Sequence, residues 1–316
     1  LEVVAADGTS EDAVFAERAE QLIAEDCVAA VFGGWTSASR EAMIPVFEKH
    51  NALLYYPKTY EGYGKSKNVF YMGATANQQT IPALEFLKAQ GKKKIFLVGS
   101  DYIGPRMANK VAKAWAAQAG VEIVGEEYTP IGNVSYTDIS AKIRASEADA
   151  VYNTLAGDSN VAFFKQLTYD GVSPETTPVM SWAISENELD ETGAPYMAGD
   201  YTATTYLESL DNPANKAFVE EFRKKYGENE STADTLQVAY SSLFLWKAAV
   251  EKADSFAVDD VRAASDGVGF ESPEGLISID GATQHLVSQS VIGKITSHGT
   301  IEPAWVSPEA IKPDPF

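Results

Sequence analysis

Cysteine and histidine are scarce in this chain of 316 residues. The single cysteine, Cys27, excludes an intrachain disulfide bond, and because it begins an apolar run we expect it in the core. The three histidines, His50, His285 and His298, are scattered, and none directly follows a predicted strand. Phosphate-loop, nucleophile-elbow and zinc-protease motifs are missing too. We therefore expect no catalysis, no cofactor and no metal, and a hydrolase with a carboxylate pair is the enzyme alternative.

Basic residues and long apolar runs are also scarce. The chain has 25 Lys and Arg against 45 Asp and Glu, which gives a net charge of −20. Nucleic-acid binders concentrate Lys and Arg, so we expect no nucleic-acid partner. No apolar run approaches the length of about 18 residues that a transmembrane helix needs, so no membrane span is expected. No signal segment precedes the first predicted strand.

Strands and helices alternate over the first two hundred residues. Apolar runs predict strands at 1–6, 27–32, 52–56, 94–99, 122–128, 150–153 and 177–181. Amphipathic patterns predict helices at 11–26, 37–50, 77–90, 105–120, 137–146 and 159–169. Such alternation is typical of parallel sheets that helices cover on both faces.

The last third has a different order. Helices are predicted at 212–226, 232–253 and 258–264, followed by strands at 275–281, 288–295 and 301–305, of which the first two are expected to pair antiparallel. Segment 201–206 is predicted to cross between lobes. We expect an α/β fold of two doubly wound, Rossmann-like lobes joined by crossing hinge strands. The expected N-terminal lobe is 1–75 plus 208–272, and 76–207 plus 273–316 are expected to form the C-terminal lobe and hinge.

Segment 31–40 carries the most information about function. A buried strand ends at Phe32, two glycines follow, and a helix begins near Ser37, which we interpret as its N-cap. Ligands of open α/β sheets lie at such places, past the carboxyl end of a strand and at a helix N-terminus with free N–H donors. Trp35, Thr36 and Ser37 offer an indole and hydroxyls but no catalytic base. The segment therefore favours binding over reaction.

The other predicted strands end in similar side chains. Four tyrosines lie within residues 55–63, among them Tyr56, although these rings could equally fill a hinge. Tyr102 lies where a strand passes into a helix at whose first position Pro105 fits. Asp158 could contact a ligand or cap a helix. The remaining candidates follow later strands or lie on the predicted crossing strand; they are Ser181, Ala183 and Tyr206.

These side chains favour a small neutral ligand. Apart from Lys58 and Arg106, no cation stands at the strand ends, whereas a phosphate or carboxylate ligand would call for Arg or Lys. Urea or a short amide is planar and needs acceptors for its NH₂ groups, donors for its carbonyl and aromatic faces around it. Tyrosine hydroxyls, Asp158, Ser37 and a helix N-terminus offer these groups.

The chain resembles the urea-binding and short-chain-amide-binding proteins of ABC transporters, within the type I periplasmic binding fold of the leucine/isoleucine/valine-binding group. The resemblance covers nearly the whole chain in order. It is carried by Gly33-Gly34-Trp35-Thr36-Ser37-Ala38-Ser39-Arg40, Tyr56-Pro57, Tyr60-Glu61-Gly62, Asn77-Gln78-Gln79, Gly99-Ser100-Asp101-Tyr102, Pro105-Arg106, Asn153-Thr154, Gly157-Asp158-Ser159-Asn160, Ser272-Pro273-Glu274-Gly275, His285-Leu286 and residues 311–316.

The resemblance implies a two-lobe protein, in the periplasm or on the cell surface as a lipoprotein, that closes on its ligand and delivers it to an ABC permease. It implies ligand contacts from Trp35, Ser37, Tyr56, Tyr102 and Asp158, with contributions from 181–183 and Tyr206. The chain departs from the family pattern in three ways. The family's first strand and helix, which precede the equivalent of Leu1, are not found in the sequence given. Lys58 and Thr59 stand where uncharged residues of other kinds are expected, and Gly104 replaces a residue that is often aromatic.

Two alternatives share this fold. In a branched-chain or other amino-acid-binding protein, Ser37 and nearby N–H groups would bind the carboxylate and Asp158 the ammonium group. In a cytosolic amide-sensing regulator of the same fold, the lobes would bind an amide as a signal and would not deliver it to a permease. Titration with amides and leucine distinguishes the first alternative, and the cellular compartment distinguishes the second.

Overall fold

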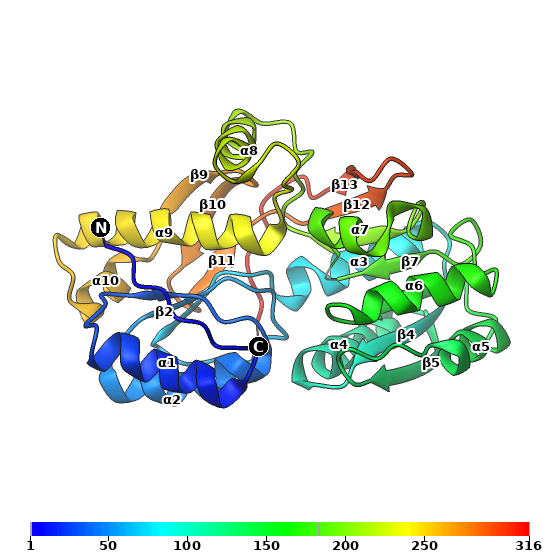
Figure 1. Ribbon diagram of the computed structural model, residues 1–316, viewed down its shortest axis with the longest axis horizontal. Coiled ribbons are helices and arrows are strands. Elements are labelled where there is room, and N and C mark those ends of the chain that lie inside the picture. Colours follow the sequence, from blue (N-terminus) through cyan, green and yellow to red (C-terminus); the bar gives the residue numbers. More distant parts are fainter. Residues whose placement is uncertain (1, 183, 316) are drawn as a thin grey trace.

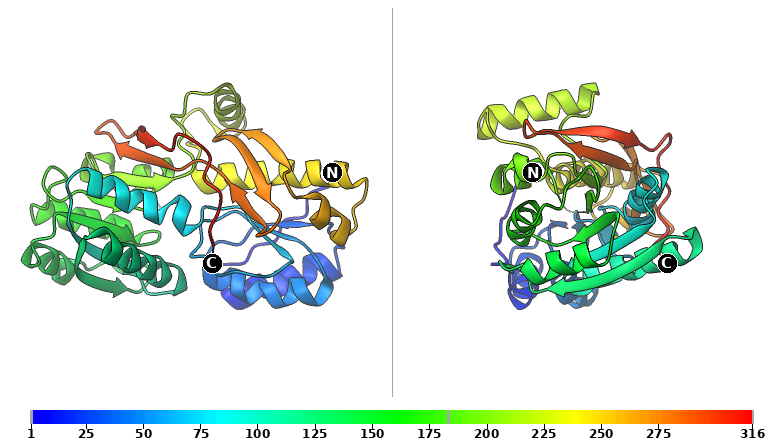
Figure 2. Two further views of the ribbon diagram at one scale, coloured as in Figure 1. Left: turned by 180° about the vertical axis from the view of Figure 1, so that it is seen from behind. Right: turned by 90° about the vertical axis from the view of Figure 1, so that its right-hand side faces the viewer.

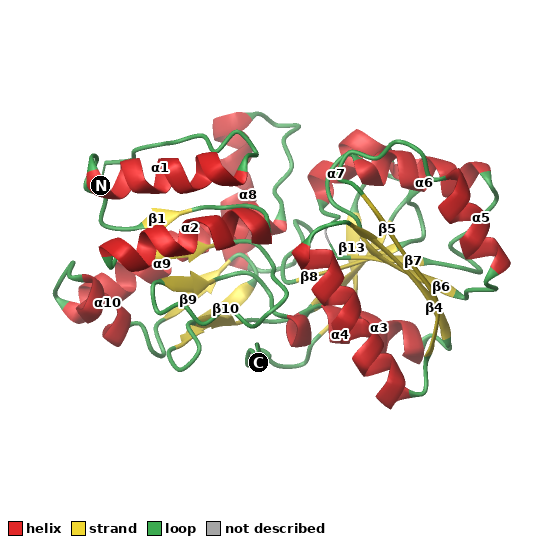
Figure 3. Ribbon diagram, turned by 90° about the horizontal axis from the view of Figure 1, so that it is seen from below, coloured by secondary structure: helices red, strands yellow, loops and turns green. Residues whose placement is uncertain are grey.

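Two α/β lobes lie side by side (Figure 1). The computed structural model describes residues 2–182 and 184–315, without the side chains of Asp190 and Glu191. The first lobe has a six-stranded sheet of order β1-β2-β3-β11-β10-β9, and the second a seven-stranded sheet of order β13-β12-β8-β7-β6-β4-β5. The expected fold class, two α/β lobes with mainly parallel central strands and helices on both faces, is confirmed (Figure 3).

The first lobe shows why its strands are buried on both sides. In β2 and β3 alternate residues enter different cores: Leu54 and Val69 pack with α1 and α2, whereas Tyr55 and Phe70 pack with α9 and α10. Figure 1 shows α9 on one side of this sheet and α1 and α2 on the other. The strands of this lobe are β1 (Val31–Phe32), β2 (Leu54–Tyr56), β3 (Val69–Tyr71), β9 (Gly269–Ser272), β10 (Gly275–Asp280) and β11 (His285–Val287). Its helices are α1 (Asp12–Ala24), α2 (Ser37–His50), α8 (Pro213–Tyr226), α9 (Asp234–Ala253) and α10 (Val258–Ala264).

The second lobe follows the same principle. Leu97 and Tyr152 face a core with α3 and α4, and Val98 and Val151 face a core with α5 and α6. Its strands are β4 (Lys94–Ser100), β5 (Glu122–Thr129), β6 (Ala150–Thr154), β7 (Val179–Ser181), β8 (Tyr201–Thr204), β12 (Val291–Ile295) and β13 (Ile301–Val306). Its helices are η1 (Ala76–Gln78), α3 (Thr80–Ala89), α4 (Ile103–Ala119), α5 (Thr137–Ala145), α6 (Ser159–Tyr169), α7 (Glu186–Thr192) and η2 (Ala194–Tyr196).

Buried glutamines hold the segments that cross between the lobes. Gln79 accepts a hydrogen bond from the hydroxyl of Thr59 (2.6 Å) and donates to the carbonyls of Trp182 (2.8 Å) and Ala203 (2.7 Å). Gln78 donates to the carbonyls of Leu286 and Ile311. The C-terminal tail therefore passes between the lobes, as Figure 2 shows in red.

Two sequence predictions about strands and one about the core are wrong. Residues 2–6 of the predicted first strand form no strand, and Val3 is 87% exposed; Leu1 lies outside the described residues. Of the strand predicted at 27–32, only β1 (Val31–Phe32) forms. Cys27 lies before it and is exposed, although we expected it in the core. A short apolar run becomes a strand only where a neighbouring strand is available to pair with it.

The predicted lobe boundary at 273 is also wrong. Strands β10 and β11 pair in the first sheet, whereas β12 pairs with β8 and β13 in the second. Segments 275–281 and 288–295 are therefore not antiparallel partners, and the chain changes lobe between β11 and β12. The predicted crossing segment 201–206 begins as β8 in the second sheet and ends in the first lobe, where Thr205 bonds to Asp234 and Tyr206 to Asn215. Strand pairing is non-local, so a local pattern cannot assign it.

Candidate functional site

The turn before α2 is organised by Thr36. Its side chain accepts a hydrogen bond from the backbone N–H of Ser39 (3.0 Å), which makes Thr36 the N-cap. Ser37 is the first residue of the helix, so the prediction that it is the N-cap is wrong. The hydroxyl of Ser37 is thereby released from capping and turns towards other partners.

Ser37 belongs to a buried charged network of the first lobe. Its hydroxyl donates to Oε2 of Glu61 (2.5 Å), and Nη2 of Arg40 donates to Oε1 of the same carboxylate (2.8 Å). Burial lowers the pKa of Arg40, but Glu61, Tyr56 and Glu41 together more than offset this effect and raise the pKa above its ordinary value. The guanidinium carbon also lies 5.1 Å from the ring centre of Tyr56 and 4.7 Å from that of Tyr60. This network holds the first turn of α2 rigidly.

Tyr56, at the end of β2, packs against the same turn. It is fully buried, and its hydroxyl donates to the carbonyl of Trp35 (2.8 Å). Trp35 itself is 50% exposed. Tyr56 therefore supports the candidate site through the backbone of Trp35.

The second lobe brings α4 against this turn. Tyr102 is the N-cap residue of α4, and a Cβ atom on Gly104 would lie 3.1 Å from the Tyr102 ring, 3.3 Å from Oγ of Ser37 and 3.5 Å from the Trp182 ring. We call Ser37, Tyr102, Gly104 and Trp182 the interlobe contact. Because α4 begins at Ile103, Pro105 is its third residue, not its first as predicted.

The electrostatics of the interlobe contact are set by few groups. Burial, followed by the Glu61 carboxylate, raises the pKa of Tyr102 to about 12, so this hydroxyl stays protonated and can donate. The indole N–H of Trp182 is buried and has no hydrogen-bond partner among the described residues. The contact thus combines two aromatic rings with neutral donors, which suits a polar ligand without a reaction.

Lys58 lies beside Trp35. Its ammonium group is 4.5 Å from the centre of the Trp35 ring and donates to the hydroxyl of Thr235 in α9 (3.2 Å). The structure thus places a cation against the indole of Trp35, a side chain that the resemblance implies as a ligand contact. Burial lowers the pKa of Lys58, although Asp234 and Glu188 act in the opposite direction.

The other predicted site residues are not brought into the interlobe contact. Asp158 is exposed and makes no capping hydrogen bond in α6. Ser181 is buried, and its hydroxyl accepts from the Asn153 side chain (3.0 Å). The hydroxyl of Tyr206 is bonded to Asn215 and Thr232, so this ring packs beside α8. The prediction for Ala183 lies outside the described residues.

Two important residues were missed as site residues. Glu61 anchors Ser37 and Arg40, and Gln79 joins the lobes. A carboxylate within the tyrosine-rich segment 55–63 was a signal for Glu61, because such a charge needs a partner when it is buried. Gln79 had no comparable signal, since its partners are backbone carbonyls from distant segments.

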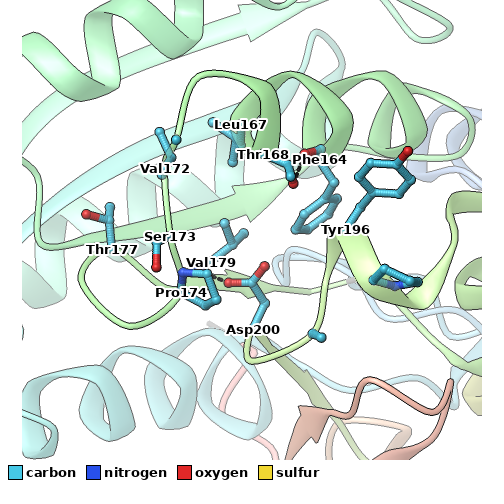
Figure 4. A pocket seen from close by; sticks show the side chains of 13 residues that line it. Phe164, Leu167, Thr168, Val172, Ser173, Pro174, Thr177, Val179, Tyr196 and Asp200 are labelled. Atoms are coloured by element: carbon cyan, nitrogen blue, oxygen red, sulfur yellow. Dashed lines mark hydrogen bonds between the residues drawn. The ribbon is translucent and has the colours of Figure 1, made fainter.

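Two cavities lie away from the interlobe contact. One of about 210 Å³ is lined by residues of α6, β7 and segments 171–177 and 195–200 (Figure 4). The buried carboxylate of Asp200 borders it and accepts a hydrogen bond from the N–H of Val179 (2.8 Å). A groove of about 880 Å³ runs along α8. Neither includes a residue of the interlobe contact.

The described residues offer neither a membrane span nor a metal site. No helix among them has the length and apolar character that crossing a bilayer requires. No group of three or more His, Cys, Asp or Glu side chains within residues 2–182 and 184–315 is arranged to hold a metal ion.

Solved structures with this fold are numerous. The solute-binding protein of an ABC transporter from Rhodopseudomonas palustris BisB5, in complex with 3,4-dihydroxybenzoic acid, superposes with a TM-score of 0.88 at 22% identity and covers 98% of this chain and 87% of its own. A leucine-binding protein from Thermotoga maritima MSB8 has a TM-score of 0.84 at 20% identity, over 96% of this chain and 87% of its own. The fold is therefore that of type I periplasmic binding proteins.

The sequence also matches known proteins directly. A Leu/Ile/Val-binding protein homolog 6 from Brucella melitensis is 26% identical over 288 residues, which cover 88% of this chain and 72% of the relative. The family model described as "Periplasmic binding protein domain" matches residues 1–316. This chain therefore belongs to the periplasmic binding protein domain family.

Proposed function

We propose that this protein is the solute-binding component of an ABC transporter, which captures urea or a short-chain amide between its lobes and delivers it to a permease. The observation that carries the proposal is the interlobe contact, where the first turns of α2 and α4 meet through Ser37 and Gly104. Binding between two lobes requires that both contribute to one small enclosure. Family membership supports this role and a location in the periplasm or, as a lipoprotein, at the cell surface.

The chemistry of the contact supports an amide ligand. Tyr102 and Trp182 offer aromatic faces and N–H or O–H donors for a carbonyl, and Glu61 lies behind Ser37 as an acceptor. Trp35 adds a half-exposed indole at the rim. No group here resembles an activated nucleophile with its base, so binding without turnover is the function that these residues support.

An amino acid is the second candidate ligand. The Brucella relatives are named Leu/Ile/Val-binding protein homologs, and one structural neighbour is a leucine-binding protein. Another neighbour was solved in complex with 3,4-dihydroxybenzoic acid, which also carries a carboxyl group. The N-terminus of α2 and the ammonium group of Lys58 would both favour a carboxylate. A cytosolic amide-sensing regulator would use the same lobes, and this alternative stays open.

Calorimetric titration tests the proposal. Purified protein is titrated with urea, acetamide and leucine, and small-angle scattering records the radius of gyration with and without each ligand. Heat of binding for an amide, together with a more compact particle, supports the proposed function. Binding of leucine alone transfers the proposal to amino acids, and the absence of heat and of any thermal shift with all three rejects both ligand classes.

A further inference from the structure

Lys58 is held by a rigid backbone. It follows the buried Tyr56-Pro57 pair at the carboxyl end of β2, and the hydroxyl of the next residue, Thr59, is bonded to Gln79 and to the carbonyl of Ala74. Gly73 lies so close that a Cβ there would be 2.1 Å from the Lys58 carbonyl carbon. The position of the Lys58 side chain is therefore determined by packing at its base.

The ammonium group has no carboxylate in direct contact among the described side chains. Among the described side chains, no carboxylate oxygen lies within 4 Å of its Nζ atom, and its hydrogen-bond partner is the neutral hydroxyl of Thr235. The carboxylates that act on it from further away have closer partners. Asp234 accepts from the Thr205 hydroxyl (2.9 Å), and Glu188 accepts from the backbone N–H of Ser185 (2.8 Å).

Arg40 of the same lobe is a buried cation with a direct counter-ion, and it provides a comparison for Lys58. That guanidinium is 1% exposed and is joined directly to Glu61 at 2.8 Å. A buried charge needs such pairing, because removing an ion from water costs several kcal/mol. Lys58 is partly buried against Trp35 and has no equivalent partner among the described residues. An anionic group of a ligand would supply such a partner.

The place of Lys58 indicates where that partner would lie. Trp35, beside its ammonium group, directly precedes the N-cap of α2 in the first lobe, and Glu188, which acts on it electrostatically, belongs to α7 of the second lobe. An anion at Lys58 would thus be held between the lobes, next to the interlobe contact. The N-terminus of α2 adds a favourable dipole for negative charge.

We propose that Lys58 is the counter-ion of an anionic group on the ligand, so that the site takes a small organic carboxylate whose other end is an amide or a similar neutral polar group. The inference rests on the proposed function, because it assumes that a solute binds between the lobes. It sharpens the ligand class from a simple amide to an amide that also carries a carboxylate. Lys58 then selects the ligand by charge, and the interlobe contact binds its neutral end.

A matched ligand pair tests the inference. Propionamide and succinamate share the same amide, and succinamate adds one carboxylate. Calorimetry at constant ionic strength is carried out on the natural protein, on Lys58→Met, on Lys58→Arg and on Lys224→Met, an exposed lysine of α8. We expect succinamate to bind about 10- to 100-fold more tightly than propionamide, as a charge-assisted hydrogen bond predicts. Lys58→Met should abolish this preference, whereas Lys58→Arg and Lys224→Met should retain it.

Other outcomes overturn the inference or the proposed function separately. If propionamide binds as tightly as succinamate, or Lys58→Met weakens both equally, the inference fails while solute binding stands. If neither ligand binds, the proposed ligand class fails. The unfolding temperature of ligand-free Lys58→Met then tests whether the Lys58 ammonium group lacks a stabilising partner. An ammonium group without a partner predicts that Lys58→Met is at least as stable as the natural protein, and a clear loss of stability overturns the inference.

Discussion

Ser37 and Gly104 belong to different lobes, yet a Cβ atom placed on Gly104 would stand 3.3 Å from the hydroxyl oxygen of Ser37. The same atom would lie 3.1 Å from the ring of Tyr102. These distances are tighter than ordinary van der Waals contact, so this close approach of the lobes depends on the absence of a side chain at 104. Gly104 replaces a residue that is often aromatic in the family, and Ser37, Tyr102 and Trp182 surround the place where such a side chain would begin.

Gly104→Ala should therefore impair closure of the lobes. Its methyl group would push the first turn of α4 away from that of α2, so we expect ligand affinity to fall about tenfold or more. The unfolding temperature should change little, because the added methyl lies at a surface between lobes. Titration and small-angle scattering measure the two effects. Ala114→Ser, on an exposed position of the same helix, is the control, and equal behaviour of both variants would contradict the prediction.

Trp35→Ala should remove the exposed aromatic wall beside the interlobe contact. The ring is 50% exposed, so the fold loses little burial and far-UV circular dichroism should be unchanged. We expect a loss of ligand affinity of at least about tenfold, in line with a buried aromatic anchor in the complex. If affinity is retained, segment 33–37 serves only to begin α2.

Arg40→Met should strongly destabilise the first lobe. It leaves the Glu61 carboxylate buried without its cation, and breaking such a pair costs about 3–5 kcal/mol of unfolding free energy. The double variant Arg40→Met, Glu61→Gln should recover part of this loss because no unpaired charge remains. Arg106→Met removes the half-exposed pair with Asp101 and should cost less than about 1 kcal/mol. Urea unfolding measures all three, and equal losses in Arg40→Met and Arg106→Met would count against the buried network.

Glu274 should make stability depend on pH. Burial, with Asp234 nearby, raises its pKa to about 8, and the single hydroxyl proton of Thr205 cannot serve both carboxylates, which lie 2.8 and 2.9 Å away. The folded state thus keeps a proton that the unfolded chain releases near pH 4.5. Stability is full below that pH and is lost as pH rises towards 8, by at most about 1.4 kcal/mol per pH unit for this group.

The substitution Glu274→Gln isolates this contribution. Urea unfolding between pH 5 and 9 should show a flatter decline for the variant, since its amide keeps a donor to Thr205 without titrating. Glu186, whose pKa burial also raises to about 8, leaves a residual slope in the variant. The exposed Glu271→Gln in β9 should follow the natural protein. An unchanged slope in Glu274→Gln would show that this carboxyl is already ionised when folded.

Local signals predicted many elements closely. Helices 37–50, 159–169 and 258–264 have the predicted bounds in the structure, because caps, apolar periodicity and Gly or Pro boundaries act within a few residues. The alternation of strand and helix likewise sufficed for two α/β lobes. At the site, Trp35, Ser37 and Tyr102 were correctly expected at strand ends, although their binding roles stay predictions.

Other features were out of reach of the sequence. Whether 275–287 joins the first or the second sheet depends on pairing with β3, about two hundred residues earlier in the chain. The N-cap of α2 is Thr36, and Ser37, one residue later, donates its hydroxyl to Glu61 from a segment 24 residues away. Asp158 and Tyr206 were chosen by residue type, and the fold directs them to solvent and to α8.

The sequence by itself determined the fold class, the acidic surface, and the neutral, aromatic character of segment 33–37. These depend on composition and on contacts between near neighbours. Only the tertiary structure decided that Ser37 meets Gly104, that Glu61 stands behind Ser37, and that Lys58 lies over Trp35 without a carboxylate within 4 Å among the described side chains. Each of these joins residues from separate strands or lobes, and such contacts form only when the chain has folded.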